Sequence, residues 1–307
     1  MIALWWNRFW FAPGSPVNLA AARIVFAVHA LWVLLSRDLA FSSDLPASFW
    51  VHATWSHRWR YLLFPGHGDL EYALQAVAAV ALVGMAIGYR PRITGLLAAL
   101  LLYHLAPLES IISNTNPMER GFTISILALS VLALSPCADA WSVSNRGRVP
   151  RVERPAWEYH WPLVLVQLFL AQVYLFAGYS KLYLVGWDWM MPEQVRYWQL
   201  YFSQIDQDIV FRGVAAYIAE RPLLCGLVGV GAVAFDLSFI SVLFWKRSRI
   251  VIIPLAVLFH AGILLANNIF FINLPQLLIF VDWDWLANRL ARRAAPVAAG
   301  ELSVELH

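Results

Sequence analysis

A lysine close to the end of a long apolar run is the residue of this sequence best suited to do chemistry. The run begins at Trp161, and Lys181 lies within "YLFAGYSKLYLVGWDW", residues 174–189. Apolar surroundings disfavour the ammonium form of an amine, and a neutral amine can take a proton from a weak acid. Lys181 is therefore a candidate base. The alternative is that its side chain extends to the lipid head groups at a helix end.

Further polar side chains interrupt the other apolar runs. An ionisable group costs about 2.5–3.5 kcal/mol in a bilayer and usually faces the interior of a helix bundle. His104 lies in the outer half of its run, whereas Asp236 and His260 lie near the middle of theirs. We expect the two histidines beside Lys181, with Asp236 deeper. The other polar residues within the runs are Arg23, His29, Glu109, Gln167 and Gln172.

Each of these residues also has a structural interpretation. Neutral histidines in membrane helices commonly form hydrogen bonds between helices. Asp236 would then bridge neighbouring helices, by pairing with Arg23 or with a histidine. Arg23 itself would extend toward the membrane surface. The sequence leaves these alternatives open.

The composition defines the kind of protein that must position these residues. Of 307 residues, 61% are hydrophobic and 13% charged, whereas a soluble domain carries about 25% charge. This difference excludes an ordinary soluble enzyme. Sixteen tryptophans fit a chain with many water–lipid boundaries, where amphipathic rings settle. The sequence predicts an all-α polytopic membrane protein, with membrane lipids as partners and no nucleic acid.

A membrane span needs about 20 mostly apolar residues, and this length predicts a bundle of about eight helices. Residues 1–16 form an interfacial N-terminal segment, residues 17–285 the membrane domain and residues 286–307 a tail. Only Asn267 and Asn268 separate the last two runs, so the alternative is seven spans with a re-entrant final run. The predicted spans are 17–36, 71–89, 92–108, 121–138, 161–183, 222–245, 250–266 and 268–285.

Basic residues predict the orientation of these spans. Arginines and Lys246 gather in every second connection and in the tail, which is typical of cytoplasmic loops. Both termini are therefore expected in the cytoplasm of a cell with this protein in its inner (plasma) membrane. Two outer loops are long, 37–70 and 184–221, and "EQVRYWQLYFSQI" in the second predicts an amphipathic helix. Cys137 and Cys225 fall at opposite ends of their spans, so neither a disulfide nor a cysteine metal site is expected.

The segment "WPLVLVQLFLAQVYLFAGYSKLYLVGWDWM", residues 161–190, resembles the vitamin K-dependent γ-carboxylase-like family, the horizontally transferred transmembrane (HTTM) domain. That family has an outward helix with a glutamine, a tyrosine, an alanine–glycine pair and a lysine–leucine pair, followed by a tryptophan. The matching positions are Gln167 or Gln172, Tyr174, Ala177, Gly178, Lys181, Leu182, and Trp187 or Trp189.

Three other segments resemble the same family in the same order. They are "VGMAIGYRPRITGLLAALLLY" around a glycine–tyrosine–arginine turn, "NTNPMERGFTISILALSVLALSPCADAWSVS", and "LFHAGILLANNIFF" with its phenylalanine–histidine pair. The resemblance covers roughly residues 18–285. It therefore extends over the whole predicted membrane domain.

The resemblance implies a chemistry for the candidate residues. In the carboxylase the matching lysine is the base that activates reduced vitamin K, so Lys181 is expected to act as base, with His260 and His104 as catalytic partners. A reduced quinone is the implied cofactor, bound by Gln172, Tyr174, Trp187 and Asp236, and no metal is expected. A small secreted peptide is the implied substrate. The site would lie toward the outer face.

Two departures from the carboxylase bear on this interpretation. The carboxylase continues into a large lumenal domain for its propeptide-bearing substrate, which this chain is expected to lack. Ser180 also stands where the carboxylase has a second basic residue. A shorter bacterial branch of the family, which includes sporulation-delaying protein B and is linked to peptide toxin maturation, fits this chain length better.

Three functions remain open at this level. The first is an enzyme that uses a membrane quinol to modify, or carboxylate, an exported peptide. The second is a non-catalytic partner in peptide maturation, export, or lipid and quinone binding. The third is a DoxX-like membrane bundle, which also carries a glycine-x-x-lysine helix end. Eight spans argue against the third, because DoxX-like chains have about half as many.

Overall fold

The computed structural model describes residues 2–37, 41, 44–46, 68–106, 119–146, 154–205 and 212–294. Within these ranges every regular element is a helix, which confirms the all-α prediction for the described part of the chain. Five helical stretches there are long and apolar enough to cross a membrane: α2 (Pro16–Leu35), α3 (Gly68–Ala86), Ala156–Leu184, Pro222–Phe244 and α11 (Lys246–Asn267). Two shorter apolar helices, α4 (Pro91–Leu105) and α5 (Glu119–Leu134), complete the set.

The remaining elements are short helices at the ends of these stretches. The Ala156–Leu184 stretch comprises η6 (Ala156–Tyr159) and α6 (His160–Leu184), and Pro222–Phe244 comprises α9 (Pro222–Ser238) and α10 (Ser241–Phe244). The amphipathic helix predicted within the second long loop is confirmed as α7 (Pro192–Ile205). The others are α1 (Ile2–Phe11), η5 (Val143–Asn145), η7 (Gly186–Met190), α8 (Arg212–Ala219), η8 (Leu274–Phe280) and α12 (Trp283–Ala294).

Proline starts three of the apolar helices. Pro16, Pro91 and Pro222 each occupy the first turn of their helix. The missing N–H of proline has no cost there, because the first amide groups of a helix lack an intrahelical acceptor. Ser15 also caps α2 by accepting a hydrogen bond from the Val17 N–H at 3.2 Å. These local signals place the start of each helix.

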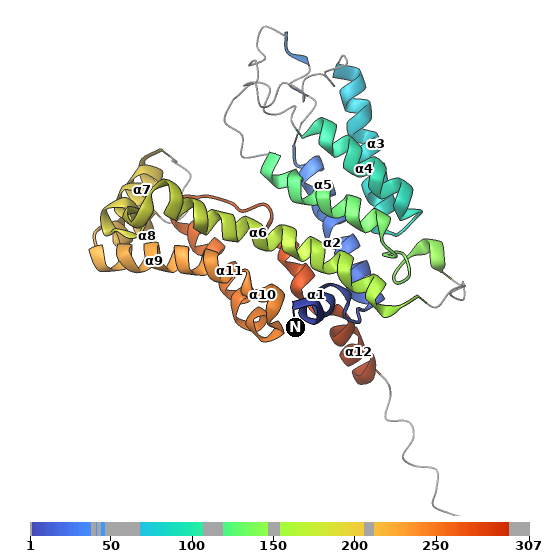
Figure 1. Ribbon diagram of the computed structural model, residues 1–307. Coiled ribbons are helices and arrows are strands. Elements are labelled where there is room, and N and C mark those ends of the chain that lie inside the picture. Colours follow the sequence, from blue (N-terminus) through green and yellow to red (C-terminus); the bar gives the residue numbers. More distant parts are fainter. Residues whose placement is uncertain are drawn as a thin grey trace, which may run out of the picture.

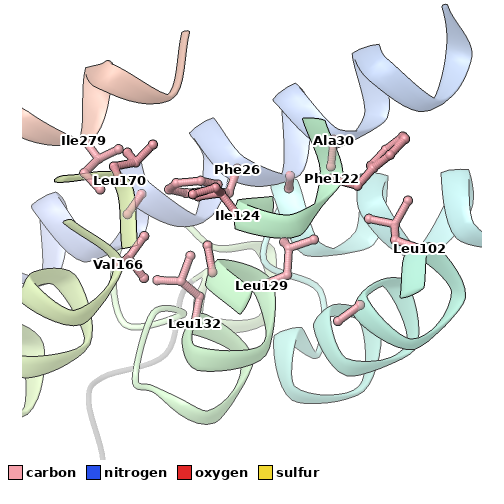
Figure 2. Close-up of a cluster of buried hydrophobic side chains, with 14 of the residues drawn as sticks. Phe26, Ala30, Leu102, Phe122, Ile124, Leu129, Leu132, Val166, Leu170 and Ile279 are labelled. Carbon is pink, nitrogen blue, oxygen red and sulfur yellow. The ribbon is translucent and has the colours of Figure 1, made fainter. Parts of the chain in front are cut away.

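The helices form two groups that α6 joins. Helices α2, α3, α4 and α5 pack on one another, and α6 runs from this group to the one it forms with α9 and α11 (Figure 1). Helices α7 and α8 lie against the far ends of α9 and α11. The core between α2, α5, α6 and η8 consists of buried apolar side chains (Figure 2). They include Phe26, Phe122, Leu129, Val166, Leu170 and Ile279.

The predicted helical span over 268–285 is wrong. Helix α11 ends at Asn267, and Asn268 adopts a left-handed conformation with φ of 53°. Residues 269–273 then run back without regular helix to the 3₁₀-helix η8. Asparagine tolerates the left-handed conformation, and Pro275 has no N–H to donate to the preceding turn of a continuous helix. Length and hydropathy could not reveal this, because they do not report backbone conformation.

Several connections that were predicted to share one side of the membrane gather at one end of the structure. The N-terminal segment, the α3–α4 turn, the segment after α5 and the start of α12 are tied to one another there by hydrogen bonds. These bonds run from Gly14 N–H to the Ala156 carbonyl (2.9 Å), from Ser142 Oγ to the Gly88 carbonyl (2.7 Å) and from Asn18 Nδ2 to Asp282 Oδ1 (3.2 Å). We call this the α1–α12 end.

Candidate ion-paired site between α6, α9 and α11

Lys181 on α6 forms an ion pair with Asp236 on α9, between Nζ and Oδ2. The lysine side chain is 21% exposed and the aspartate side chain 4%. Gly178, one turn before Lys181, makes this close approach possible. A Cβ atom at Gly178 would lie 2.9 Å from the Leu237 side chain and 3.0 Å from the Asp236 Cβ. The lysine therefore faces a buried carboxylate rather than extending freely to the lipid.

His260 on α11 belongs to the same group. Its imidazole is buried, and it lies within electrostatic range of both Asp236 and Lys181. The Nδ1 atom lies 2.7 Å from the Ala256 carbonyl oxygen, so in the neutral ring Nδ1 carries the hydrogen and Nε2 is the acceptor. The ring also meets Phe271 edge-on, with centroids 4.3 Å apart.

Tyr174 on α6 is the fourth member of this group. Its ring stacks on Phe239 with centroids 3.9 Å apart and meets the His260 ring edge-on at 5.7 Å. The phenol lies within electrostatic range of Asp236. Gln172, predicted to share this site, is half-buried on α6 and has no hydrogen-bond partner among the described residues.

The tryptophan beside the lysine is Trp189 rather than Trp187. Lys181 Nζ lies 5.6 Å from the centroid of the Trp189 ring, whereas Trp187 is 74% exposed. Gly186 adopts a φ of 72°, which reverses the chain after α6 and brings η7 back toward the lysine. Of the two tryptophans that match the family pattern, Trp189 is therefore the one beside Lys181. The structure does not bring Trp187 to the lysine.

His104 lies apart from this group. Its Nε2 atom is 2.8 Å from the carboxylate of Glu71, whose side chain is 1% exposed. This second pair joins α3 to α4, away from the C-terminal part of α6 (Figure 1). The structure thus does not support the expected proximity of His104 to Lys181. Glu71 was not predicted, because an acidic residue in the first turn of a span resembles loop sequence. Glu109 lies outside the described residues.

Arg23 forms hydrogen bonds with backbone carbonyl groups that follow the end of α5. It is fully buried, and its guanidinium donates to the carbonyl groups of Cys137 and Trp141. A cation in this position satisfies carbonyl groups that a helix end leaves free. Arg23 therefore neither extends to the lipid nor pairs with Asp236, which corrects both sequence-based alternatives.

His29 and Gln167 form hydrogen bonds with backbone carbonyl groups between the end of α11 and the end of η8. His29 Nε2 lies 2.8 Å from the Ile272 carbonyl oxygen, and Gln167 Nε2 donates to the Ile279 carbonyl at 3.1 Å. Carbonyl groups outside a regular helix need such partners where water is absent. Ser125 and Gln276 extend the cluster around His29 Nδ1, at 3.2 and 3.1 Å. These polar residues have a structural explanation.

The Lys181–Asp236 pair has no such explanation. Among the described residues neither side chain forms a hydrogen bond to a backbone group, and a buried ion pair is on average no more stabilising than apolar residues of the same volume. An amine, a carboxylate, an imidazole and a phenol therefore lie together between α6, α9 and α11, where the ion pair also bridges α6 and α9. This arrangement can exchange protons. Within the described ranges, no three His, Cys, Asp or Glu side chains gather to hold a metal ion.

The fold and this site define a polytopic α-helical membrane protein with an ionisable group held between α6, α9 and α11. The model of the HTTM domain family matches residues 11–285, so the chain belongs to the HTTM domain family. Searches of curated proteins and of solved structures found no match.

Proposed function

We propose that Lys181 and Asp236 form the proton-accepting pair of a membrane enzyme that uses a reduced quinone to modify an exported peptide. The observation that supports this proposal is the Lys181–Asp236 pair itself, which forms no hydrogen bond to a backbone group among the described residues. The family relationship to the transmembrane part of the γ-carboxylase supports it further. His260 is placed to accept a hydrogen bond at Nε2, and Tyr174 to donate one from its phenol.

The pair can accept a proton after an internal transfer between its two members. As ammonium and carboxylate, the pair is electrically neutral and carries one titratable proton. Transfer of that proton from Lys181 to Asp236 frees the amine, which then removes a proton from a phenolic hydroxyl. The outcome at the protein would be the Lys181 ammonium beside the neutral Asp236 carboxylic acid, with the added proton drawn from the bound reductant. Asp236 thus keeps the net charge of the site low, which matters in apolar surroundings.

The residues around the pair fit an aromatic head group. A bound hydroquinone would supply a phenolic proton to the pair, and dissolved dioxygen would accept its two electrons. Trp189 and Tyr174 offer aromatic surfaces beside Lys181, and the half-buried Gln172 offers a side-chain amide on α6. We assign head-group contacts to these three residues and proton transfer to Lys181 and Asp236.

The same proposal includes the topology. Helix α11 starts at the α1–α12 end, where Phe244 packs on Phe9, and leads to Asn267 at the other end, whereas Asp282 is bound to Asn18 back at the α1–α12 end. The irregular segment can therefore return to the α1–α12 end as a non-helical eighth crossing. Basic loops assign this end to the cytoplasm of an inner-membrane protein, so Lys181 near the opposite end of α6 faces outward.

Lysine chemistry gives a sharp test, because Lys181 and Lys246 are the only lysines of the chain. The protein in lipid nanodiscs would receive a reduced naphthoquinone, labelled hydrogencarbonate and a glutamate-containing peptide. Lys181→Arg keeps the charge but removes the exchangeable amine, so label incorporation should fall about 10²–10⁴-fold. Lys246→Arg, at an exposed position, is the matched control and should have no effect.

The outcomes separate the enzyme from the alternative. Full incorporation by a folded Lys181→Arg variant would disprove the role of Lys181 as base. If the wild type binds the reduced naphthoquinone, seen as quenching of tryptophan fluorescence, but incorporates no label, the protein is a binding partner in maturation or export. Gel filtration of each variant checks that it is folded.

A further inference from the structure

Helix α12 begins at the same level as the first turn of α2, a helix that is long enough to span the membrane. Asn18, in the first turn of α2, donates through Nδ2 to Asp282 Oδ1 at 3.2 Å and accepts from the Asp284 N–H at 3.0 Å. Asp282 also caps α12 by accepting from the Trp285 N–H at 3.1 Å. Because α2 is long and apolar enough to cross the bilayer, these bonds fix the start of α12 at the head-group level.

The sequence of α12 separates an apolar face from a basic one. At about 100° per residue, Trp283, Leu286 and Leu290 fall within a sector of roughly 60°. Trp285, Arg289 and Arg292 fall within another such sector. The Arg289 guanidinium lies 5.0 Å from the centroid of the Trp285 ring, so the two side chains on this second face are in contact. We call the second face the Trp–Arg face.

Most of α12 is not covered by the rest of the described chain. Trp283 and Leu286 are half-buried, but Leu290 is 58% and Trp285 56% exposed. Arg289 and Arg292 are also exposed. A helix with an apolar face and a basic flank at head-group level is suited to lie in the plane of the membrane.

Other cations surround the same end of the molecule. Arg8 on α1 and Lys246 and Arg247 at the start of α11 are exposed. Trp5 and Phe9 on α1 stack near Phe244, with centroids 6.0 and 5.6 Å apart, which holds these two segments together. The exposed charge at this end is therefore mainly positive. A membrane surface that complements it must carry negative charge.

We propose that the Trp–Arg face of α12 binds the phosphate groups of anionic phospholipids, with Leu290 inserted among the acyl chains. Arginine donates to phosphate oxygens in a fixed fork geometry, and tryptophan settles at the head-group boundary. The helix would then anchor the α1–α12 end on an anionic bilayer surface. This inference does not depend on the proposed enzymatic function.

A fluorophore at position 290 tests the inference in the full-length protein. Leu290→Cys would carry an environment-sensitive dye, since Cys137 and Cys225 are both buried. The protein is placed in vesicles of phosphatidylcholine, alone or with roughly 30% phosphatidylglycerol as the anionic lipid. We expect blue-shifted emission and protection from aqueous iodide with the anionic lipid. Arg289→Gln with Arg292→Gln should remove this difference.

Arg154→Gln is the matched control. Arg154 is also exposed at this end, but it is paired with Asp139 at 3.0 Å and Glu158 at 3.2 Å, so its loss should leave the dye protected. Equal protection in both kinds of vesicle would overturn the inference. A dye exposed in both would do the same and would point to a soluble protein partner. Native mass spectrometry of bound phosphatidylglycerol on unlabelled wild type and double variant repeats the test without the cysteine.

Discussion

The Nε2 atom of His29 lies 2.8 Å from the carbonyl oxygen of Ile272. A carbonyl only accepts hydrogen bonds, so Nε2 must carry the hydrogen, and Nδ1 is left to accept one from Gln276 Nε2 at 3.1 Å. A histidine in the middle of an apolar helix thus supports a chain segment that has no helical hydrogen bonds of its own. The polar residues of this membrane domain divide into those that support backbone and those that pair with each other.

This relationship predicts that His29→Leu destabilises the protein. The change would leave the part-buried Ile272 carbonyl without this donor, at a cost of about 1–3 kcal/mol. His29→Gln keeps a donor and should cost less. Thermal unfolding in detergent measures both, with Val28→Leu as control because Val28 is 50% exposed on the same helix. A His29→Leu midpoint equal to that of the control would show that the irregular segment does not need this donor.

The sequence predicted the membrane class and most helices, because apolar runs of sufficient length have few other solutions. It also predicted that Lys181, His260 and Asp236 face the interior of the bundle, because lipid exposure of such groups is costly, and the structure buries Asp236 and His260 and leaves Lys181 21% exposed. The identity of their partners depends on how helices pack. Asp236 was expected deeper than the lysine but is its direct partner.

Two predictions, the role of Trp187 and the final helical span, failed because of local backbone geometry. The choice between Trp187 and Trp189 depends on the left-handed Gly186, which spacing alone does not reveal. The final span was read as a helix, although the asparagine at position 268 and Pro275 already carried the signal for a break. Hydropathy outweighed them because the residues around them are apolar.

Close packing at Gly178 gives a prediction about the site. Gly178→Val should push α6 away from α9, because even its Cβ would approach Leu237 to 2.9 Å, and overpacking of this kind costs about 1–3 kcal/mol. Gly231→Val on α9 is the control, since nothing lies within 4 Å of a Cβ there. Thermal unfolding and quinol-dependent label incorporation would be measured for both variants. Equal losses in the two would contradict a special role for the α6–α9 contact.

Cys137, which follows the last turn of α5, gives a prediction about pH. Burial raises the pKa of the Cys137 thiol to about 11, although the nearby Arg23 charge acts in the opposite direction. At pH 8 its thiolate should thus be roughly one-hundredth as populated as that of an ordinary thiol. In a Cys225→Ser background, iodoacetamide labelling should be slow at pH 8 and accelerate toward pH 11. Labelling at the rate of a free thiol at pH 8 would contradict this environment.

The raised pKa of Cys137 also makes the stability of the folded protein depend on pH. The folded state holds the Cys137 proton more tightly than the unfolded chain, whose thiol ionises near its ordinary value of 9.0. The stabilisation from this site is therefore complete below about pH 9 and declines as the pH rises toward 11. Between pH 8 and pH 10.5 the unfolding midpoint of the wild type should fall relative to that of Cys137→Ser. A wild type that gains stability over this range relative to the variant would reverse the sign.

The final prediction separates stability from function at the Lys181–Asp236 pair. Removing one partner of a buried ion pair leaves an uncompensated charge, so Lys181→Met or Asp236→Leu alone should each cost about 3 kcal/mol, the low end of the usual range, because Lys181 is 21% exposed. The double variant removes both charges and should recover most of this loss. Unfolding midpoints of the four proteins complete the cycle. A double variant that is stable but inactive in label incorporation would identify the pair as functional. One that is as unstable as the sum of its single changes would show that the two side chains do not stabilise each other in the folded protein, which contradicts the ion pair.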